Sequence, residues 1–264
     1  MQNKIPQKLY LAFTICFTFI FCLPQTFSRS NLLFNADKLT LKHTSKKILT
    51  IAPKVELPLY SSLYDSLQLK TIGLGKPVFE YAMMGFNQMI KLGSISNKQI
   101  ISIIDFSKPS NLKRLFVIDL ENYKVLYNTY VAHGVKSGKE IAKQFSNSME
   151  SHKTSLGFYT TLGTYEGKHG YSLHLNGLEK GINDNAYNRN IVMHAADYVN
   201  EYFIKTNGFL GRSFGCPAVS KLEYRPIINK IKNGTCLFIY GPDQSYIKKS
   251  RLLNENYKLD LPNI

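Results

Sequence analysis

The sequence is poor in cysteine and lacks the motifs that hold metal ions. Its 264 residues include four cysteines and six histidines, with no CxxC pair, no HExxH sequence and no cluster at zinc-site spacing. We therefore expect neither a metal ion nor another cofactor. Cys16 and Cys22 lie near the N-terminus, so that only Cys216 and Cys236 remain for the body of the chain.

Acidic residues are also scarce. The chain has 18 Asp and Glu residues against 33 Lys and Arg residues, which gives a formal net charge of +15. Such a surplus favours polyanionic surroundings such as nucleic acid, anionic lipid or an anionic cell envelope, although solubility alone would also explain it. The lysines are scattered, and no basic run with interleaved aromatic residues indicates a nucleic-acid groove. We expect an anionic cell envelope as partner and no nucleic acid.

The N-terminal segment has the layout of a secretory signal. Lys4 and Lys8 precede an uncharged run over 9–23, and small residues stand at the minus-three and minus-one positions of a cleavage site after Ser28. We expect a signal peptide over 1–28. The alternative, an uncleaved anchor, would be short for a membrane span and would still place the remainder outside the cytoplasm. The protein is thus expected to be exported, as a periplasmic or envelope-associated protein.

The remaining chain divides by composition into four parts. Residues 29–55 have no clean periodicity and predict a linker or mobile arm, and residues 56–108 predict a small helical subdomain. In that subdomain "KPVFEYAMMGFNQMIKLG" has apolar residues at helical spacing, and "SNKQIISIID" predicts a shorter helix or a helix-to-strand junction. Residues 109–246 predict strands and turns, and 247–264 a C-terminal tail. The fold class expected is α+β, with a β-rich domain after the helical subdomain.

Within the β-rich part, several runs alternate with turn signals. "RLFVIDLENYKVLYNTYVAHG" predicts a hairpin with its turn at Glu121 and Asn122, and "SLGFYTTLGTY", "GYSLHLNGL" and "TCLFIY" predict further strands. "RNIVMHAADYVNEYFIKTNG" predicts a strand ending at His194 and a helix over about 196–206. A second helix after Cys216 would use Ser220 and Glu223 as a capping box.

Cys216 occupies an unusual position, between Gly215 and Pro217 in "GRSFGCPAVS". Glycine permits backbone angles closed to other residues and proline removes a donor, so that a sharp, rigid turn should present the thiol. Cys236 lies in the apolar run "GTCLFIY", which predicts a buried strand. A disulfide between the two would be ordinary in an exported protein, but their different environments favour a free thiol at Cys216.

His194 is the histidine whose position best suits a base for that thiol. It closes an apolar strand directly before a predicted helix, whose positive end would disfavour a charged imidazole, and a neutral imidazole can accept a proton. A thiol needs a nearby base or positive charge to become a thiolate. The histidine precedes the cysteine, whereas papain-like enzymes have the reverse order. Considered alone, His194 could also be a structural histidine at a strand end.

From about Arg114 to Tyr240 the sequence resembles the murein L,D-transpeptidase catalytic-domain family, of the YkuD-like type. The resemblance lies in ordered pieces that include "FVIDL", "YVAHGVKSG", "GKHGYSL", "RNIVMHAADYV" and above all "GRSFGCPAVS". It implies a β-rich YkuD-like catalytic domain with His194 as base and Cys216 as nucleophile. Ser213 and Gly215 match the other fixed places of the family's Ser-x-Gly-Cys motif.

The reaction that the resemblance implies is acyl transfer on the peptide stems of peptidoglycan. The Cys216 thiolate would attack the diaminopimelate carbonyl of a donor stem, expel the terminal D-alanine and form a thioester, and an amine of a second stem would then complete a cross-link. Two alternatives remain open at this point. The same site would serve an L,D-carboxypeptidase or endopeptidase that uses water as acceptor, and the basic charge alone would fit a non-enzymatic wall-binding protein.

Further residues near the motif complete the expected site. Pro217 has no N–H, so the oxyanion donors should be the amides of Cys216, Gly215 or Phe214. Many relatives carry a histidine two places before the cysteine and a polar or basic residue two places after it, where this chain has Phe214 and Ala218.

A site for anionic stems needs a cation, and Arg212 is the arginine nearest the nucleophile in sequence. We expect Arg212 to bind the donor stem. Arg189 and His174 are the next candidates. His174 is also the reserve base, and it alternates with Ser172 on one face of a predicted strand, where both would line the cleft.

Overall fold

The computed structural model describes residues 57–254, and their side chains from residue 60 onward. All of them belong to the compact unit 51–264. The expected signal peptide over 1–28 and linker over 29–55 lie outside the described residues. Over 57–254, no helix is long and apolar enough to cross a membrane.

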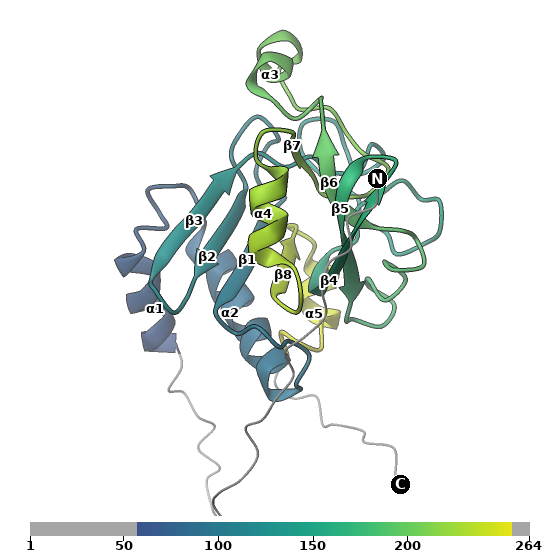
Figure 1. Ribbon diagram of the computed structural model, residues 1–264. Helices are drawn as coiled ribbons and strands as arrows, with labels where there is room; N and C mark the ends of the chain where they lie inside the picture. Colours follow the sequence, from purple (N-terminus) through teal and green to yellow (C-terminus); the bar gives the residue numbers. More distant parts are fainter. Residues whose placement is uncertain (1–56, 255–264) are drawn as a thin grey trace, which may run out of the picture. The chain divides into compact units, whose positions relative to one another are not determined.

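A single eight-stranded sheet organises this unit, in the strand order β3-β2-β1-β8-β4-β5-β6-β7 (Figure 1). The strands are β1 (Ile100–Asp105), β2 (Leu115–Asp119), β3 (Lys124–Thr129), β4 (Gly157–Gly167), β5 (Gly170–Gly177), β6 (Val192–Ala196), β7 (Ala218–Ser220) and β8 (Cys236–Tyr240). Neighbouring strands are antiparallel except β1 with β8 and β6 with β7, which run parallel. The β-rich fold with a few helices, expected for a YkuD-like domain, is confirmed.

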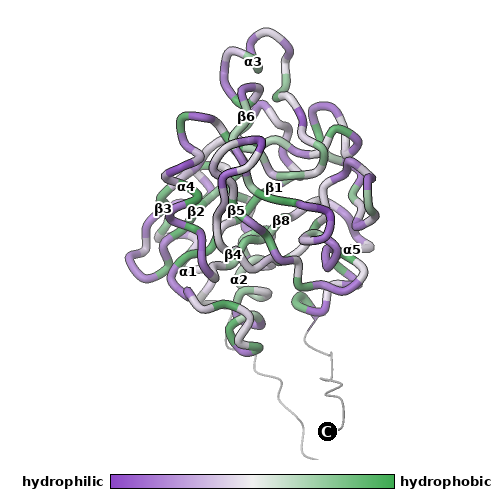
Figure 2. Tube along the Cα trace, turned by 45° about the vertical axis from the view of Figure 1, so that its right-hand side comes forward, coloured by the Kyte–Doolittle hydropathy of each residue, from purple (hydrophilic) through white to green (hydrophobic). Residues whose placement is uncertain are grey.

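The centre of the sheet is its most apolar part. Every residue of β1 and β2 is buried, as are Cys236 to Ile239 of β8, and the trace of β1 is strongly hydrophobic (Figure 2). Strands covered on both faces favour such near-continuous apolar runs. The predicted hairpin with its turn at Glu121 and Asn122 forms as β2 and β3. The run "IISIID", expected as a helix or a helix-to-strand junction, is instead the central strand β1, because it pairs with both β2 and β8.

The two ends of the sheet approach each other and make a nearly closed barrel. Ala132, which follows β3, bridges to Ala218 in β7, and its N–H donates to the Ala218 carbonyl at 2.8 Å. Three residues further along, the Val135 N–H donates to the Ser213 carbonyl at 2.7 Å. These bonds hold the segment before β7, which includes Cys216, against residues 132–135.

Two helices precede the sheet, α1 (Leu57–Ser66) and α2 (Lys76–Lys91). The apolar stripe predicted for "KPVFEYAMMGFNQMIKLG" is buried and belongs to the same core as the central strands. Gly85 allows the close approach, since a Cβ at this position would lie 2.0 Å from the Phe158 Cζ of β4. The segment expected as a helical subdomain over 56–108 therefore shares its core with the sheet and ends in the strand β1.

The third helix, α3 (Glu201–Asn207), projects from the sheet near β7 and buries none of its residues (Figure 1). The Asn200 side chain caps it by accepting the Phe203 N–H at 2.7 Å, and Gly208 ends it at φ 81°. The helix expected from 196 thus begins later. Residues up to Ala196 remain extended because they pair with β7.

The predicted capping box of the next helix, α4 (Tyr224–Ile231), is wrong. The Glu223 carboxylate accepts a hydrogen bond from the Thr129 hydroxyl of β3, and the Ser220 Oγ accepts the Leu222 N–H at 3.2 Å. A contact with a distant strand thus takes the place of the local cap. Pro226 falls in the first turn of α4, where its missing N–H costs little.

The last helix, α5 (Gln244–Lys249), is fastened to the body of the unit through a buried carboxylate. Glu179 accepts hydrogen bonds from the Phe158 N–H at 2.9 Å, from the Tyr246 hydroxyl at 3.2 Å and from the Ser250 hydroxyl. Leu252 and Leu253 are buried beyond it. Residues 247–254 therefore belong to the folded unit rather than to the tail expected over 247–264.

Candidate active site

Cys216 lies on a tight turn directly before β7, as its sequence context predicts. The Ser213 hydroxyl closes the turn, since its Oγ accepts the Gly215 N–H at 3.1 Å and donates to the Cys216 carbonyl at 2.6 Å. Gly215 has φ +124°, and a Cβ there would lie 2.9 Å from the Lys153 carbonyl oxygen. Only glycine fits this position without strain, and the serine two residues earlier fixes the turn.

The Cys216 thiol faces the start of β6. Its Sγ lies 3.5 Å from the Val192 nitrogen and 3.7 Å from the Asn190 carbonyl oxygen. Burial raises the pKa of the Cys216 thiol, while the Val192 N–H and the positive charge of Arg189 lower it. Cys216 and Cys236 are both free, and Cys236 is buried in β8. Because burial outweighs the other effects, the resting group is a thiol and needs a base to become a nucleophile.

Arg189 is held beside the turn of Cys216 by a set of oxygen acceptors. Its Nη1 donates to the Ser146 carbonyl at 2.8 Å, and its Nη2 donates to the Lys153 carbonyl at 2.7 Å and the Ser151 hydroxyl at 3.0 Å. A Cβ on Gly215 would lie 3.3 Å from this Nη2. The guanidinium is thus fixed where its charge favours the thiolate. The sequence offered Arg189 only as a reserve for Arg212, because nothing local in "NRN" indicates these distant partners.

His194 is buried on β6, with 4% of its surface exposed. Its Nδ1 lies 2.8 Å from the Ala195 carbonyl oxygen. A carbonyl can only accept, so Nδ1 carries the proton of the neutral ring and Nε2 is left to accept one. Burial lowers the pKa of His194, and a charge on His169 lowers it further. The expected neutral imidazole is therefore supported, but its cause is burial, since the helix predicted to follow His194 begins only at Glu201.

Backbone pairing brings the segments of His194 and Cys216 side by side. In the parallel β6–β7 pair His194 is opposite Ala218, and the His194 N–H approaches the Pro217 carbonyl oxygen at 3.4 Å. Among the hydrogen bonds of residues 57–254, none joins the imidazole to the thiol. Catalytic hydrogen bonds are often long before substrate binds, so the arrangement is compatible with proton transfer.

A cavity of about 570 Å³ opens beside His194. Its walls are the turn between β4 and β5, the end of β6 and the approach to α4; the lining residues are Lys168, His169, Gly170, His194, Ala195, Ala196, Asp197, Tyr198, Lys221 and Tyr224. The rings of His169 and His194 stack in it, with centroids 4.4 Å apart. Within the described chain, no group of three or more His, Cys, Asp or Glu residues could hold a metal ion.

The remaining predicted site residues lie around the turn but outside this lining. Phe214 is 72% exposed and packs its ring on His152, with 4.6 Å between centroids. The Arg212 Nη1 donates to the Gly138 carbonyl at 3.2 Å, and its guanidinium lies 5.5 Å from the Phe209 ring. Arg212 thus points toward the 138 turn in this structure, and its role in binding a donor stem stays a prediction.

His174 and Ser172 on β5 occupy different environments. The His174 ring stacks on Tyr165 at 4.4 Å, and its backbone is opposite Val192. Ser172 is fully buried, and its hydroxyl donates to the Gly170 carbonyl at 2.9 Å. The expectation that Ser172 lines an open cleft is therefore wrong, whereas His174 stays an untested reserve candidate.

Of the ten residues that line the cavity, only His194 was among the predicted site residues, and those missed include Tyr198, Lys168 and His169. Burial and the negative charge of a Cys216 thiolate raise the pKa of Tyr198 to about 12, so that its hydroxyl remains a donor at neutral pH. A Cβ on Gly211 would lie 2.4 Å from the Tyr198 Cβ, which shows how closely this tyrosine packs on the nucleophile loop. His169 and Lys168 stand in a glycine-bounded turn, a pattern that gave no signal beyond a solvated loop.

Comparison with solved structures gave matches of low identity. An L,D-transpeptidase from Mycobacterium smegmatis is 12% identical with a TM-score of 0.34, over 54% of this chain and 59% of that one. The helical cell shape determining protein Pgp2 from Campylobacter jejuni is 13% identical with a TM-score of 0.37, over 62% and 57%. An L,D-transpeptidase from Stackebrandtia nassauensis is 14% identical with a TM-score of 0.33, over 69% and 76%. The chain thus spans about three fifths of the length of the first two.

No curated protein matches the sequence. The family model of the L,D-transpeptidase catalytic domain, however, matches residues 70–240. That range is more than half of the chain, and it contains all eight strands of the sheet, including the strand of His194, and the turn of Cys216. The protein therefore belongs to the L,D-transpeptidase catalytic domain family.

Proposed function

We propose that the protein is a peptidoglycan L,D-transpeptidase that joins two peptide stems through a thioester on Cys216. The observation that carries the proposal is the pairing of β6 with β7, the strand that directly follows the turn of Cys216. It sets a proton-accepting imidazole, His194, on the strand next to a thiol held on a rigid turn. Family membership supports the same reaction class.

The first half-reaction acylates the enzyme. His194 takes the thiol proton on Nε2, and the Cys216 thiolate attacks the carbonyl of the diaminopimelate residue in the donor stem. The terminal D-alanine leaves as the carbon–nitrogen bond breaks, and its amine takes the proton from the imidazolium. The fixed charge of Arg189 stabilises the thiolate that forms on the way.

The second half-reaction releases the stem. The amine of a second stem attacks the thioester carbonyl and gives a proton to His194, and the carbon–sulfur bond breaks. The thiolate takes back the proton, and a new amide joins the two stems. Both tetrahedral intermediates need donors for their oxyanion. The Gly215 N–H is already bonded to Ser213, so that the amides of Cys216 and Phe214 are the donors we assign.

The setting of the reaction follows from charge and from the N-terminal segment. A net charge of +15 favours contact with an anionic envelope, and the signal layout over 1–28 directs the chain to that compartment. Peptidoglycan stems lie there. We therefore propose that the enzyme is periplasmic or associated with the cell envelope.

The test is incubation of the purified protein with disaccharide-tetrapeptides, followed by mass spectrometry. A cross-linked dimer with loss of D-alanine supports the transpeptidase. Tripeptides without dimers would instead indicate the hydrolytic alternative, an L,D-carboxypeptidase. Products that persist in the Cys216→Ala variant would contradict the thioester on Cys216 in both enzymatic functions, and the absence of any product from the wild-type protein would favour a wall-binding protein.

A further inference from the structure

The cavity beside His194 reaches the proposed base but not the proposed nucleophile. Its lining includes His194 and Tyr198 but not Cys216, whose thiol faces Val192 and Asn190 instead. A donor stem bonded to Cys216 therefore occupies the space on the thiol side. The cavity is left for a second molecule that must contact the same histidine.

The order of proton transfers identifies that second molecule. After acylation the donor remains attached to Cys216, and the incoming nucleophile must give its proton to His194. A cavity of about 570 Å³ is far larger than one water molecule needs. Its size and its contact with the base fit the end of a second peptide stem.

The charges of the wall point to the chemistry of that end. Lys221 and Asp197 form an ion pair at 2.7 Å, and Lys168 lines the same cavity from the turn between β4 and β5. In the described part of the chain no acidic group lies within ion-pair distance of Lys168. The cavity thus presents two ammonium groups and one carboxylate next to the base. The free end of a diaminopimelate side chain has the complementary pattern, an amine on a carbon that also bears a carboxylate.

We propose that this cavity is the acceptor site, and that Lys168 and Lys221 bind the carboxylate next to the attacking amine. The inference rests on the proposed transpeptidase function. Bound in this way, the carboxylate directs the amine toward His194, and Asp197, which lines the same cavity, is the acidic group that would hold the ammonium form before the proton is lost. Water lacks the carboxylate, so the same contacts favour transpeptidation over hydrolysis.

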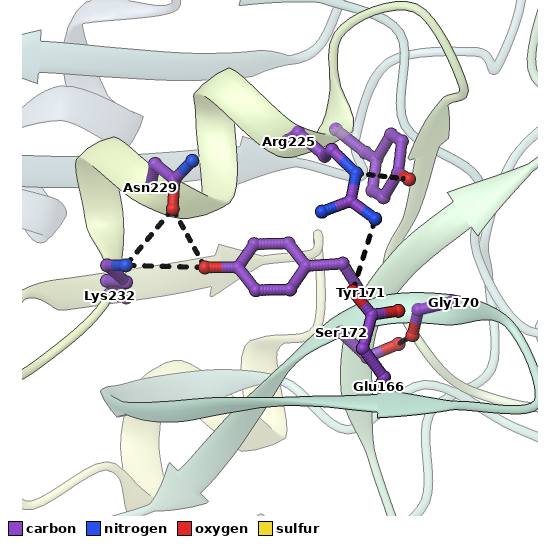
Figure 3. Close-up of polar contacts among 8 residues, drawn as sticks. Glu166, Gly170, Tyr171, Ser172, Arg225, Asn229 and Lys232 are labelled. Atoms are coloured by element: carbon purple, nitrogen blue, oxygen red, sulfur yellow. Dashed lines mark hydrogen bonds and ion pairs between the residues drawn. The ribbon is translucent and has the colours of Figure 1, made fainter. Parts of the chain in front are cut away.

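Contacts with α4 hold the wall that carries Lys168. Figure 3 shows Tyr171 reaching from β5 to α4, where its hydroxyl donates to the Asn229 side chain at 2.8 Å and lies 3.3 Å from the Lys232 Nζ. On the other side of the turn, Arg225 donates to Glu166 at 3.1 Å. The turn between β4 and β5 is therefore tied to α4 at both flanks, and the distance between the two lysine-bearing walls is set before an acceptor binds.

The test separates the two half-reactions and uses two acceptors. Wild type, Lys168→Gln, Lys221→Gln and the double variant are first acylated with a tetrapeptide donor, and the thioester is followed by intact-protein mass spectrometry. Transfer is then measured to a tetrapeptide with a free carboxylate next to the diaminopimelate amine, and to the same peptide with that carboxylate amidated. Lys180→Gln, which changes an exposed lysine outside the cavity, is the matched control.

We expect unchanged acylation in all variants. Transfer to the free-acid acceptor should fall about tenfold in the double variant, since each exposed ion pair contributes modestly. Transfer to the amidated acceptor should be slow in wild type and unaffected by the substitutions. If the double variant transfers to the free-acid acceptor at the wild-type rate, the acceptor site is overturned. An equal loss of transfer rate for the free-acid and amidated acceptors also overturns it. A wild-type protein that never forms the thioester overturns the proposed function itself, and the acceptor site with it.

Discussion

The imidazole rings of His169 and His194 stack at 4.4 Å, with an angle of 26° between their planes. One ring belongs to the turn between β4 and β5 and the other to the buried strand β6. The contact covers the proposed base and places a second titratable ring on its face. A proton on His169 therefore makes a proton on His194 less favourable.

Replacement of His169 should change the pH dependence of acylation. His169→Ala removes the neighbouring charge and opens His194 to water, and both effects raise the lowered pKa of His194 toward its ordinary value of 6.5. Activity needs the neutral imidazole, so the acid limb of the rate profile should move to higher pH. The test is the rate of thioester formation measured from about pH 4 to about pH 8, a range that covers the titration of histidine. An acid limb that stays in place would contradict the coupling.

The roles of the two proposed catalytic groups can be separated by substitution. Cys216→Ala should abolish thioester formation, and His194→Ala should lower its rate by about 10²–10⁴-fold, the usual contribution of a general base. The thermal midpoint of each variant serves as the control for folding. His174→Ala should acylate normally, because its ring packs on Tyr165 away from the cavity lining. An inactive His174→Ala beside an active His194→Ala would transfer the role of base to His174.

Arg189 should control the acidity of the nucleophile. Arg189→Lys keeps a charge but loses the planar fork that reaches Ser146, Ser151 and Lys153, so the charge will sit less closely to the thiol. The pKa of Cys216 should rise, and alkylation by iodoacetamide should slow at neutral pH. Its pH profile measures the change directly.

Arg212→Lys is the matched comparison for that experiment. Arg212 contacts Gly138 and Phe209, and it is not among the charges that shift the pKa of the Cys216 thiol. We expect its alkylation profile to match wild type. The expectation that Arg212 binds the donor stem is tested on the same sample, because it predicts slower donor acylation at unchanged thermal stability. Identical alkylation profiles for both variants and wild type would show that Arg189 does not lower the pKa of the Cys216 thiol.

A buried histidine outside the cavity should set part of the acid stability. The His133 Nδ1 accepts from Arg114 at 2.8 Å, and burial together with that charge lowers the pKa of His133 to about 3. The unfolded chain binds this proton near pH 6.5 and the folded chain only near pH 3. The free energy of unfolding should therefore fall as pH decreases between these values, by at most about 1.4 kcal/mol per pH unit from this group.

His133→Gln provides the comparison, since its amide can accept from Arg114 but does not titrate. Denaturant unfolding of both proteins at several pH values isolates the contribution of the histidine from that of the buried carboxylates. As pH falls, the unfolding free energy of the wild type should decrease more than that of the variant. A pH-independent difference would show that His133 does not remain neutral in the folded state.

The sequence was most informative where a local pattern decides the structure. The apolar runs of β2 and β8 indicate buried strands because burial on both faces needs little else, and "RSFGCP" indicates a turn because glycine and proline restrict the backbone directly. Resemblance of ordered motifs then indicated the family. Each of these signals is contained within a few neighbouring residues.

Long-range pairing decided the features that the sequence did not reveal. β6 continues to Ala196 because β7 pairs with it, and this delays the helix that propensity alone places there. The Glu223 carboxylate does not form the expected cap and instead accepts a hydrogen bond from the hydroxyl of Thr129, a residue on the distant strand β3. Arg189 reaches Ser146 and Lys153, and His169 reaches His194, across gaps that no local pattern encodes. The wall of the cavity could therefore not be deduced from one sequence.

The bridge between Ala132 and Ala218 joins segments that lie far apart along the chain. Contacts of such large sequence separation require costly loop closure and slow the folding of a β-rich protein. The nucleophile turn is fastened at this seam, so that a chain with every other strand in place but the seam open would still lack an ordered thiol. Acquisition of activity during refolding should accordingly follow closure of this seam, which makes catalysis a reporter of the pairing between Ala132 and Ala218.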